Sequence, residues 1–381
     1  MRQSWLAQDA SSDSAFNELA LELFALQFTH NSSYQRICRS CKVDPQTVTH
    51  WTDVPFAPTL AFKELELTSI PCGERTKVFF SSGTSLAKTS RHFHFSASMQ
   101  IYEESLWLWF ERCFLANKRA GMAFLYLTPP AGQAPHSSLV HMFATIARRA
   151  GTAESHFGAE AQPDGSWSVN EHACLDFLER AIDENQPIEV LGTAFTFVHL
   201  LDALSSRKLA LRLPAGSRVL ETGGYKGRSR VLTKPELHKL ISQVLGVLPT
   251  HIVSEYGMSE LSSQAYDEML GDVSTEPHGS NSDAVAARRV FQFPSWARAQ
   301  IISPETGLEV QDGQTGLICI FDLANVYSVA AIQTEDLGVR RGSRFELLGR
   351  ASEAEPRGCS LMSIDLQASA ALLDNRPPIA R

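Results

Sequence analysis

The spacing of apolar side chains divides the chain into parts with different predicted structure. Apolar residues recur at helical spacing over 14–30, which predicts an amphipathic helix. The proline-punctuated stretch WTDVPFAPTLAFKELEL follows, and prolines favour extended backbone there. SRHFHFSAS then alternates as a strand does, and an apolar helix is predicted over 97–116. We expect the aromatic residues of that helix to pack in the core.

From residue 121 onward, short apolar runs alternate with helical stretches. In chain order these are AFLYLT, 136–150, IEVLGT, 195–205, RVLETGG, 233–246 and THIVSEYG. Strands that alternate with helices are typical of a mostly parallel sheet covered by helices. Past about residue 285, glycines separate alternating segments, which predicts antiparallel structure. We therefore expect an α/β body over 1–285, a smaller β-rich part over 286–365, and a tail over 366–381.

Composition narrows the class of protein. The chain has 381 residues, 44% of them hydrophobic, and a net charge of −8, so it can bury a large core but offers no basic surface for nucleic acid. No apolar run approaches the length of a membrane span, and MRQSWLAQDASSDS lacks the apolar segment of a signal peptide. We expect a soluble, cytoplasmic protein. The seven cysteines are scattered, and the pair Cys38 and Cys41 has no partner pair, which favours reduced thiols over a zinc site.

One loop carries candidate chemistry. The stretch VFFSSGTSLAKTS (78–90) places hydroxyl side chains, a glycine and a lysine after an apolar run. A P-loop of the GxxxxGK[ST] kind is excluded, because Ser82 and Ala87 occupy its glycine positions and a strand pattern follows. Two interpretations remain open from the loop alone. It is either a plain turn rich in Ser and Thr, or a phosphate loop that joins two strands.

Short motifs further along the chain favour the phosphate loop. The loop is similar to the motif [ST]SGT[ST]GxPK of adenylate-forming enzymes. EYGMSE resembles their YGxTE motif, ETGGY their adenine-binding turn, QTEDLG their aspartate motif, and LLGR the Gly-Arg pair near their hinge. These motifs occur in the expected order over residues 81–350. The matching residues are Ser81, Ser82, Gly83, Thr84, Ser85, Lys88, Gly223, Gly224, Tyr225, Tyr256, Gly257, Met258, Ser259, Glu260, Asp336, Gly349 and Arg350.

The resemblance narrows to one family. DVPFAPTLAFK, LETGGYKGR, EYGMSELSSQAY and GRASEAEPRGCSL look like the acyl-protein synthetases (long-chain-fatty-acid–protein ligases) of bacterial bioluminescence operons, and the similarity covers nearly the whole chain. Phenylacetate–CoA ligases are more distant. The resemblance implies the large layered α/β N-terminal domain of adenylate-forming enzymes, with a smaller antiparallel β part that closes the nucleotide site. No lysine follows Lys239, so we expect their small C-terminal domain, with its catalytic lysine, to be truncated or absent.

The resemblance also implies cofactors, ATP and Mg²⁺, and roles for single residues. Ser81, Ser82, Gly83 and Thr84 would surround the phosphates. Gly223, Gly224, Tyr225, Tyr256, Gly257, Met258, Ser259, Asp336 and Arg350 would complete the nucleotide site, with Asp336 on the ribose hydroxyls. Glu260 would bind the metal ion. Structural alternatives stay open: Glu260 could stabilise a helix N-terminus, and Asp336 could be a turn residue.

Two residues are candidates for catalysis. Lys88 would add positive charge at the phosphates, or else be a solvated surface lysine. Cys359, in EPRGCSL, would accept the acyl group as a thioester, as family members do near the carboxyl terminus. Arg357 favours its thiolate and Glu353 opposes it, and an inert thiol is the alternative. His199 lies where the superfamily shapes its acyl pocket, and we expect a core histidine there rather than a base.

The leading hypothesis is ATP-dependent activation of a carboxylic acid, most simply a fatty acid, to an acyl-adenylate and its transfer to a protein thiol. Its partners would be the acid and an acyl-accepting protein or carrier protein. The first alternative is a ligase that delivers the acyl group to coenzyme A or to a carrier-protein arm. The second, from a different class, is a nucleotide-binding subunit without turnover, which the replacements Leu86 and Ala87 would permit.

Overall fold

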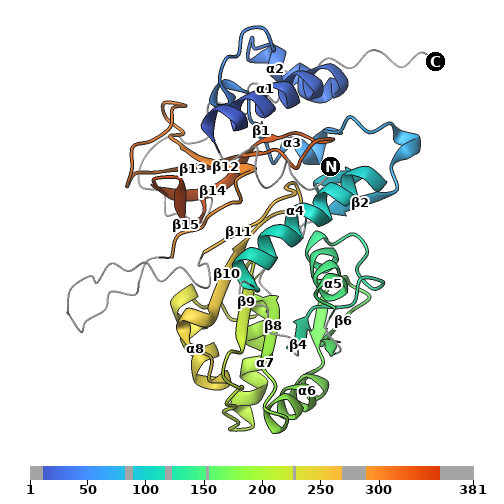
Figure 1. The fold of residues 1–381 in the computed structure, drawn as a ribbon, viewed down its shortest axis with the longest axis vertical. Helices are drawn as coiled ribbons and strands as arrows, with labels where there is room; N and C mark the ends of the chain where they lie inside the picture. Colours follow the sequence, from blue (N-terminus) through green and yellow to red (C-terminus); the bar gives the residue numbers. More distant parts are fainter. Residues whose placement is uncertain are drawn as a thin grey trace.

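The computed structural model describes residues 12–81, 89–115, 122–151, 154–225, 229–267 and 289–351. A mostly parallel sheet with its helices forms one end of the molecule, and a smaller, mainly antiparallel sheet with two N-terminal helices forms the other (Figure 1). This is the α/β fold that the sequence predicts. The predicted boundary at 285/286 falls among residues 268–288, outside the described residues, so the division into domains stays a prediction.

The large sheet is parallel except at one edge. Its order is β11-β10-β9-β8-β4-β5, and only β11 runs antiparallel to its neighbour. The strands are β4 (Ala123–Leu127), β5 (Ser155–Phe157), β8 (Ile188–Thr193), β9 (Arg218–Thr222), β10 (Ile252–Tyr256) and β11 (Ala265–Tyr266). The central strands β4, β8, β9 and β10 are buried along their whole length. Helices cover both faces of these strands, so their few charged residues, such as Glu189, Glu221 and Glu255, are buried as well.

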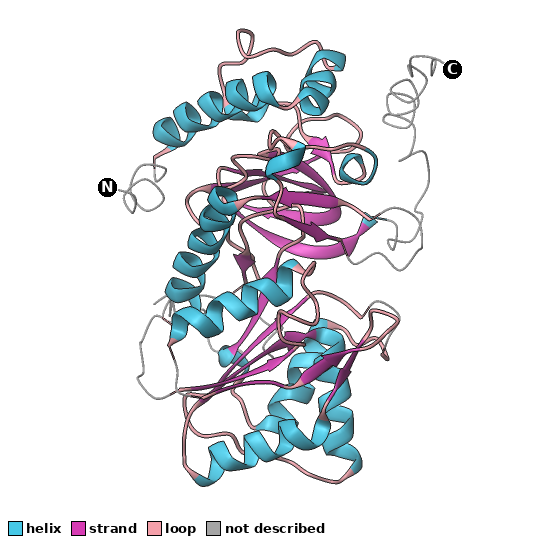
Figure 2. Ribbon diagram, turned by 90° about the vertical axis from the view of Figure 1, so that its right-hand side faces the viewer, coloured by secondary structure: helices cyan, strands magenta, loops and turns pink. Residues whose placement is uncertain are grey.

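Helices cover the two faces of this sheet separately (Figure 2). Strand alternation sends Phe124 and Tyr126 of β4 to one face and Leu125 and Leu127 to the other. The first pair packs with α4 (Ser96–Phe114) and α5 (Ser138–Ala150). The second pair packs with α6 (Glu171–Asp183), α7 (Ala194–Ser206) and α8 (Lys234–Leu245). The aromatic residues of α4 lie mostly in the core, as predicted: Tyr102, Trp109, Phe110 and Phe114 are buried.

The small sheet confirms the antiparallel structure predicted past residue 285. Its order is β1-β14-β13-β12, and β15 pairs with β14; only β1 joins in parallel. The strands are β1 (Ala57–Pro58), β12 (Ala297–Ile302), β13 (Thr315–Asp322), β14 (Ala331–Arg341) and β15 (Arg344–Arg350). Helix α1 (Asp13–His30) packs against it through Phe16, whose ring meets Phe321 at 6.0 Å.

The remaining described elements are short, and the sequence patterns predicted only one of them. β3 (Arg91–His94) is the predicted strand SRHFHFSAS, and it pairs antiparallel with β2 (Lys77–Phe80). The paired strands β2 and β3 thus flank residues 82–88 in the chain, as the phosphate-loop interpretation expects. The other elements are α2 (Ser32–Ser40), α3 (Ala61–Glu64), β6 (Ala159–Ala161), β7 (Trp167–Val169) and the 3₁₀ turns 51–53, 72–74 and 249–251.

A buried carboxylate fastens the large sheet's edge to the small sheet. Asp322 ends β13 and is fully buried. It accepts hydrogen bonds from the backbone N–H groups of Ser262, Ser263 and Ala324 at 2.8–3.0 Å, and from the Ser263 hydroxyl at 2.7 Å. Burial raises the pKa of Asp322, and these donors oppose that shift. The segment that follows β10 is therefore fixed to the end of β13.

Replacing Asp322 by alanine should lower the free energy of unfolding by about 3–5 kcal/mol, because several buried donors lose their acceptor. Urea unfolding followed by circular dichroism measures the change. Asp176→Ala, at an exposed position of α6, is the control and should change it by less than about 0.5 kcal/mol. Equal midpoints for the two variants would contradict this account of Asp322.

Candidate nucleotide site

The described motif residues meet at the carboxyl ends of the parallel strands. The Gly223–Tyr225 turn follows β9 and the Gly257–Glu260 segment follows β10. Glu255 and Thr222 are register partners, so both segments leave the sheet at the same edge. In open α/β sheets, ligands bind outside this edge. Motifs that are about 30 residues apart in the sequence, ETGGY and EYGMSE, are therefore close together in the structure.

Backbone geometry explains the glycines at this edge. Gly223 adopts a φ of +68°, which favours glycine because other residues pay a steric cost there. A Cβ on Gly257 would lie 2.3 Å from Oε1 of Glu255, so any other residue there would require the Glu255 side chain to shift. Gly223, Gly224 and Gly257 are exposed, which leaves their backbone open to a ligand.

Tyr256 and Asp336 connect the two sheets. The Tyr256 hydroxyl donates to Oδ2 of Asp336 at 2.9 Å. Burial, together with the Asp336 charge, raises the pKa of Tyr256, so the hydroxyl stays protonated as a donor. The ring is 6% exposed and packs edge-on against Phe345 at 5.5 Å. The prediction that Tyr256 belongs to the nucleotide site stays a prediction.

Asp336 and Arg350 lie side by side. They are register partners on β14 and β15, and Arg350 is exposed. The Thr334 hydroxyl accepts the Asp336 backbone N–H at 3.1 Å, which holds the strand locally. These two residues of the predicted nucleotide site therefore belong to one strand pair of the small sheet.

The β2–β3 hairpin is closed at the start of the candidate phosphate loop. The N–H of Ser81 donates to the Ser90 carbonyl at 3.2 Å, and the N–H of Ser90 donates to the Ser81 hydroxyl at 3.0 Å. Ser81 is thus placed at the hairpin base. The predicted site residues Ser82, Gly83, Thr84 and Lys88 lie outside the described residues, as does Cys359.

Glu260 lies against this hairpin base. Its side chain is 5% exposed, and both carboxylate oxygens accept hydroxyl hydrogen bonds. The Ser90 hydroxyl donates to Oε1, and the Ser259 hydroxyl donates to Oε2 at 2.9 Å. Asn325 Nδ2 donates to the Glu260 carbonyl at 2.8 Å. The candidate metal ligand is therefore held between the hairpin, the YGxTE-like segment and the loop between β13 and β14.

Sequence reasoning missed two buried histidines beside Glu260. His92 Nδ1 donates to the Ser259 carbonyl at 2.9 Å, and the rings of His92 and His94 lie 4.1 Å apart between centroids. Burial lowers the pKa of His92 to about 4, although the hydrogen bond to Ser259 opposes it. Burial, then the neighbouring His92, also lowers the pKa of His94. Both rings are neutral near pH 7. In β3, His92 and His94 alternate with Arg91 and Phe93, and this alternation could have predicted that both histidines face the same side of the strand.

Two buried glutamates at the strand ends were also missed. On the α8 face, Glu221 accepts from Lys234 at 2.7 Å and from His238 at 3.2 Å. Burial alone would raise the pKa of Glu221, but Lys234 and His238 outweigh burial and lower it to about 2. On the other face, Glu255 accepts from the Thr222 hydroxyl, and burial raises its pKa to about 7. A carboxylate inside the apolar runs RVLET and IVSEY was the signal.

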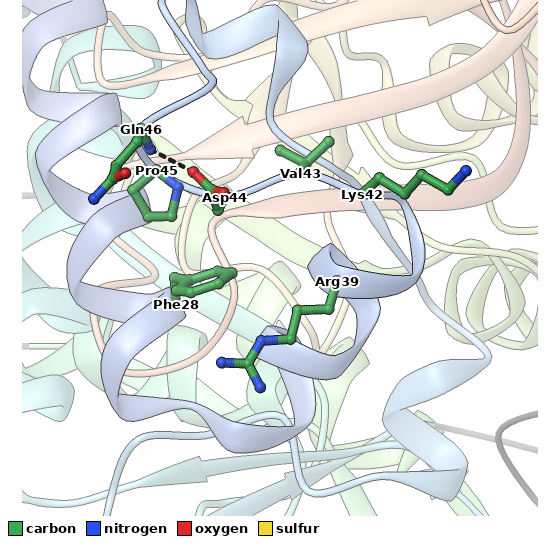
Figure 3. Close-up of a pocket in the computed structure, with 7 residues that line it drawn as sticks. All are labelled: Phe28, Arg39, Lys42, Val43, Asp44, Pro45 and Gln46. Atoms are coloured by element: carbon green, nitrogen blue, oxygen red, sulfur yellow. Dashed lines mark hydrogen bonds between the residues drawn. The ribbon is translucent and has the colours of Figure 1, made fainter.

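Other predicted features lie elsewhere. His199 is exposed on α7, so the expectation of a core histidine was wrong: it falls on the solvent side of a helix whose neighbours Val198 and Leu200 are buried. Figure 3 shows a surface pocket lined by Phe28, Arg39, Lys42, Val43, Asp44, Pro45 and Gln46. It lies beside α1 and α2, and none of the predicted site residues lines it.

Among the described residues, no helix is long and apolar enough to cross a membrane.

Comparison with known proteins agrees with the geometry. Residues 5–366 match the family model described as "Acyl-protein synthetase, LuxE". A 2-hydroxyisobutyryl-CoA ligase, solved in an open conformation with 2-HIB-AMP and CoA, is similar in structure. The TM-score is 0.63 at 13% identity, over 89% of this chain and 74% of that chain. The same ligase in its postadenylation state, in complex with 2-HIB-AMP, has a TM-score of 0.63 at 12% identity. That match covers 89% of this chain and 68% of the ligase chain. A search of curated protein sequences gives no match.

The neutral histidines predict a loss of stability in acid. The pKa of His92 is about 4 when folded and 6.5 when unfolded, so its contribution is fully present above 6.5 and is lost as pH falls toward 4. Between about pH 7.5 and pH 5.5, His92 should account for about 1 kcal/mol of this loss.

Urea unfolding at the two pH values tests the assignment. His92→Gln keeps an N–H donor for the Ser259 carbonyl but does not titrate, so it should lose less stability in acid than the parent chain. His172→Gln, at an exposed position of α6, should leave the pH dependence unchanged. A parental pH dependence in His92→Gln would exclude His92 as the source.

Proposed function

The chain belongs to the LuxE acyl-protein synthetase family, and we propose that it uses ATP and Mg²⁺ to activate a fatty acid and pass it to a protein thiol. It is an adenylate-forming acid–thiol ligase. In the first step, a carboxylate oxygen attacks the α-phosphorus of ATP, and the bond to pyrophosphate breaks. In the second, a thiolate attacks the acyl carbonyl, AMP leaves, and a thioester remains.

The arrangement around Glu260 and Asp336 carries this proposal. Phosphoryl transfer needs positioned charge more than covalent chemistry from the protein. The buried carboxylate of Glu260 at the base of the hairpin supports a role in holding a phosphate-bound cation. The Tyr256–Asp336 bond brings the candidate ribose ligand to the same sheet edge. The Asp336 carboxylate accepts the Tyr256 hydroxyl at Oδ2, and a carboxylate is the acceptor that ribose hydroxyls require.

The residues at this site fit a magnesium ion. Mg²⁺ is usually held by one or two carboxylates together with substrate phosphates and water, not by a protein cage. The described residues contain no cluster of three or more His, Cys, Asp or Glu that could form such a cage. Glu260 supplies a single hard oxygen ligand, as that chemistry requires. When bound, the ion would neutralise charge on the phosphates, while Ser90 and Ser259 hold the carboxylate.

The loop residues complete the proposal. Ser82, Gly83, Thr84 and Lys88 would surround the phosphates, because Ser81 and Ser90 close the hairpin from which the loop leaves. Arg350, next to Asp336 in register, would reach the ribose or a phosphate. Gly223, Gly224 and Tyr225 would border the adenine.

Removing either acidic ligand should abolish most adenylate formation. Glu260→Ala and Asp336→Ala should each slow acid-dependent exchange of pyrophosphate into ATP by about 10²–10³-fold, or about 3–4 kcal/mol. The assay uses radiolabelled pyrophosphate, Mg²⁺ and a panel of acids of different length. Glu305→Ala, in an exposed turn, is the control and should exchange at the parental rate. Parental exchange in a folded Glu260 or Asp336 variant would refute the assigned roles.

The proposed acyl acceptor within the chain is Cys359. In Cys359→Ser, adenylate formation should persist, while the hydroxylamine-labile label from radioactive fatty acid and ATP disappears from the protein. Cys72→Ser, which removes an exposed thiol, should keep the label. Undiminished labelling in Cys359→Ser would move the acceptor to another thiol. Release of the acyl group to added coenzyme A would favour the CoA ligase alternative.

A further inference from the structure

Ser90 has a hydroxyl that the hairpin does not need. Hairpin closure uses the backbone of Ser90: its N–H donates to the Ser81 hydroxyl, and its carbonyl accepts the Ser81 N–H. The side chain is fully buried, and its hydroxyl instead donates to Oε1 of Glu260, 170 residues away in the chain. The Ser90 side chain therefore links the start of β3 to the segment Gly257–Glu260.

The backbone around Glu260 is fixed independently of that hydroxyl. His92 Nδ1 holds the Ser259 carbonyl at 2.9 Å, and Asn325 Nδ2 holds the Glu260 carbonyl at 2.8 Å. With the main chain anchored on both sides, the remaining freedom of Glu260 is rotation of its side chain. The Ser90 and Ser259 hydroxyls, one on each carboxylate oxygen, restrict that rotation.

Both donors are neutral, whereas two other buried acids of the protein have charged partners. Glu221 is paired with Lys234 at 2.7 Å, and Asp267 with Arg289 at 2.9 Å. Within the described ranges, Glu260 has no lysine or arginine within ion-pair distance. Hydroxyl donors hold a carboxylate in place and leave its negative charge available to a cation, whereas an ammonium or guanidinium would neutralise it.

We propose that Ser90 is a positioning residue whose hydroxyl orients the Glu260 carboxylate toward the magnesium ion of the bound nucleotide. The inference rests on the proposed function, in which Glu260 is the metal ligand. Hydrogen bonds to metal-binding carboxylates typically change metal affinity by 10–100-fold when they are removed.

The test is a binding measurement that needs no turnover. Calorimetric titration gives the ATP affinity with and without Mg²⁺, and the ratio is the magnesium-dependent gain. In Ser90→Ala this gain should fall about tenfold, while ATP binding without Mg²⁺ changes little. Ser90→Thr keeps the hydroxyl and should keep the gain. Ser90→Cys, close to serine in size but a weak donor, should lose it and provides the test if Ser90→Ala does not fold.

A matched control separates positioning from stability. Ser217 is also a buried serine, and its hydroxyl bonds the Pro214 carbonyl and the Ile188 N–H at the opposite end of β9. Ser217→Ala should lower the melting temperature and leave the magnesium-dependent gain unchanged. A parental gain in the Ser90 variants that lack the hydroxyl would overturn the inference.

The outcomes also separate this inference from the proposed function. Pyrophosphate exchange by the parent chain, together with a parental gain in Ser90→Ala, would refute the role of Ser90 and leave the proposed function standing. No exchange with any acid, together with a gain that depends on Ser90, would refute the proposed reaction and support the role of Ser90. A parent chain without any magnesium-dependent gain would refute Glu260 as the metal ligand and Ser90 with it.

Discussion

The buried carboxylate of Glu260 is the constraint around which the site is built. A carboxylate taken out of water is costly unless hydrogen bonds replace its hydration. Here the hydroxyls of Ser90, from the hairpin, and Ser259, from the segment after β10, bind the carboxylate, and Asn325, from the loop after β13, binds the Glu260 backbone carbonyl. Satisfying the polar groups of Glu260 therefore requires all three parts of the chain to be in place together.

Asn325 extends that constraint to the small sheet. Its Oδ1 accepts from the Ser262 hydroxyl at 2.6 Å, and its carbonyl accepts from Gln27 of α1 at 2.7 Å. Asp322, three residues earlier, holds the backbone of Ser262 and Ser263. The segment after β10 is thus held from both sheets, which gives it the rigidity that a metal-binding carboxylate needs.

Much of the fold could be predicted from periodicity alone. Helices α1, α4, α5, α7 and α8 have long apolar faces or clear caps; for example, Thr233 and Glu236 form a capping box at α8. The order of the motifs predicted which segments meet, because parallel strands present their carboxyl ends at one edge. The hydrogen-bond partners of the site residues could not be predicted. Tyr256 and Asp336 are 80 residues apart. No local sequence pattern indicates that Ser90 bonds Glu260.

The pairing of α1 and β1 with the region of β14 also bears on how the protein folds. Gln27 of α1 bonds the Ala330 N–H across 303 residues, and β1 pairs with β14 through Ala57 and Ile332. During synthesis, α1 and β1 emerge long before these partners exist. Contacts between residues so far apart in the sequence slow folding. The chain must lose the entropy of closing a long loop before these contacts can stabilise it. The small sheet can therefore form only after β13 and β14 are made, and until then the apolar face of α1 and the Gln27 amide stay uncovered.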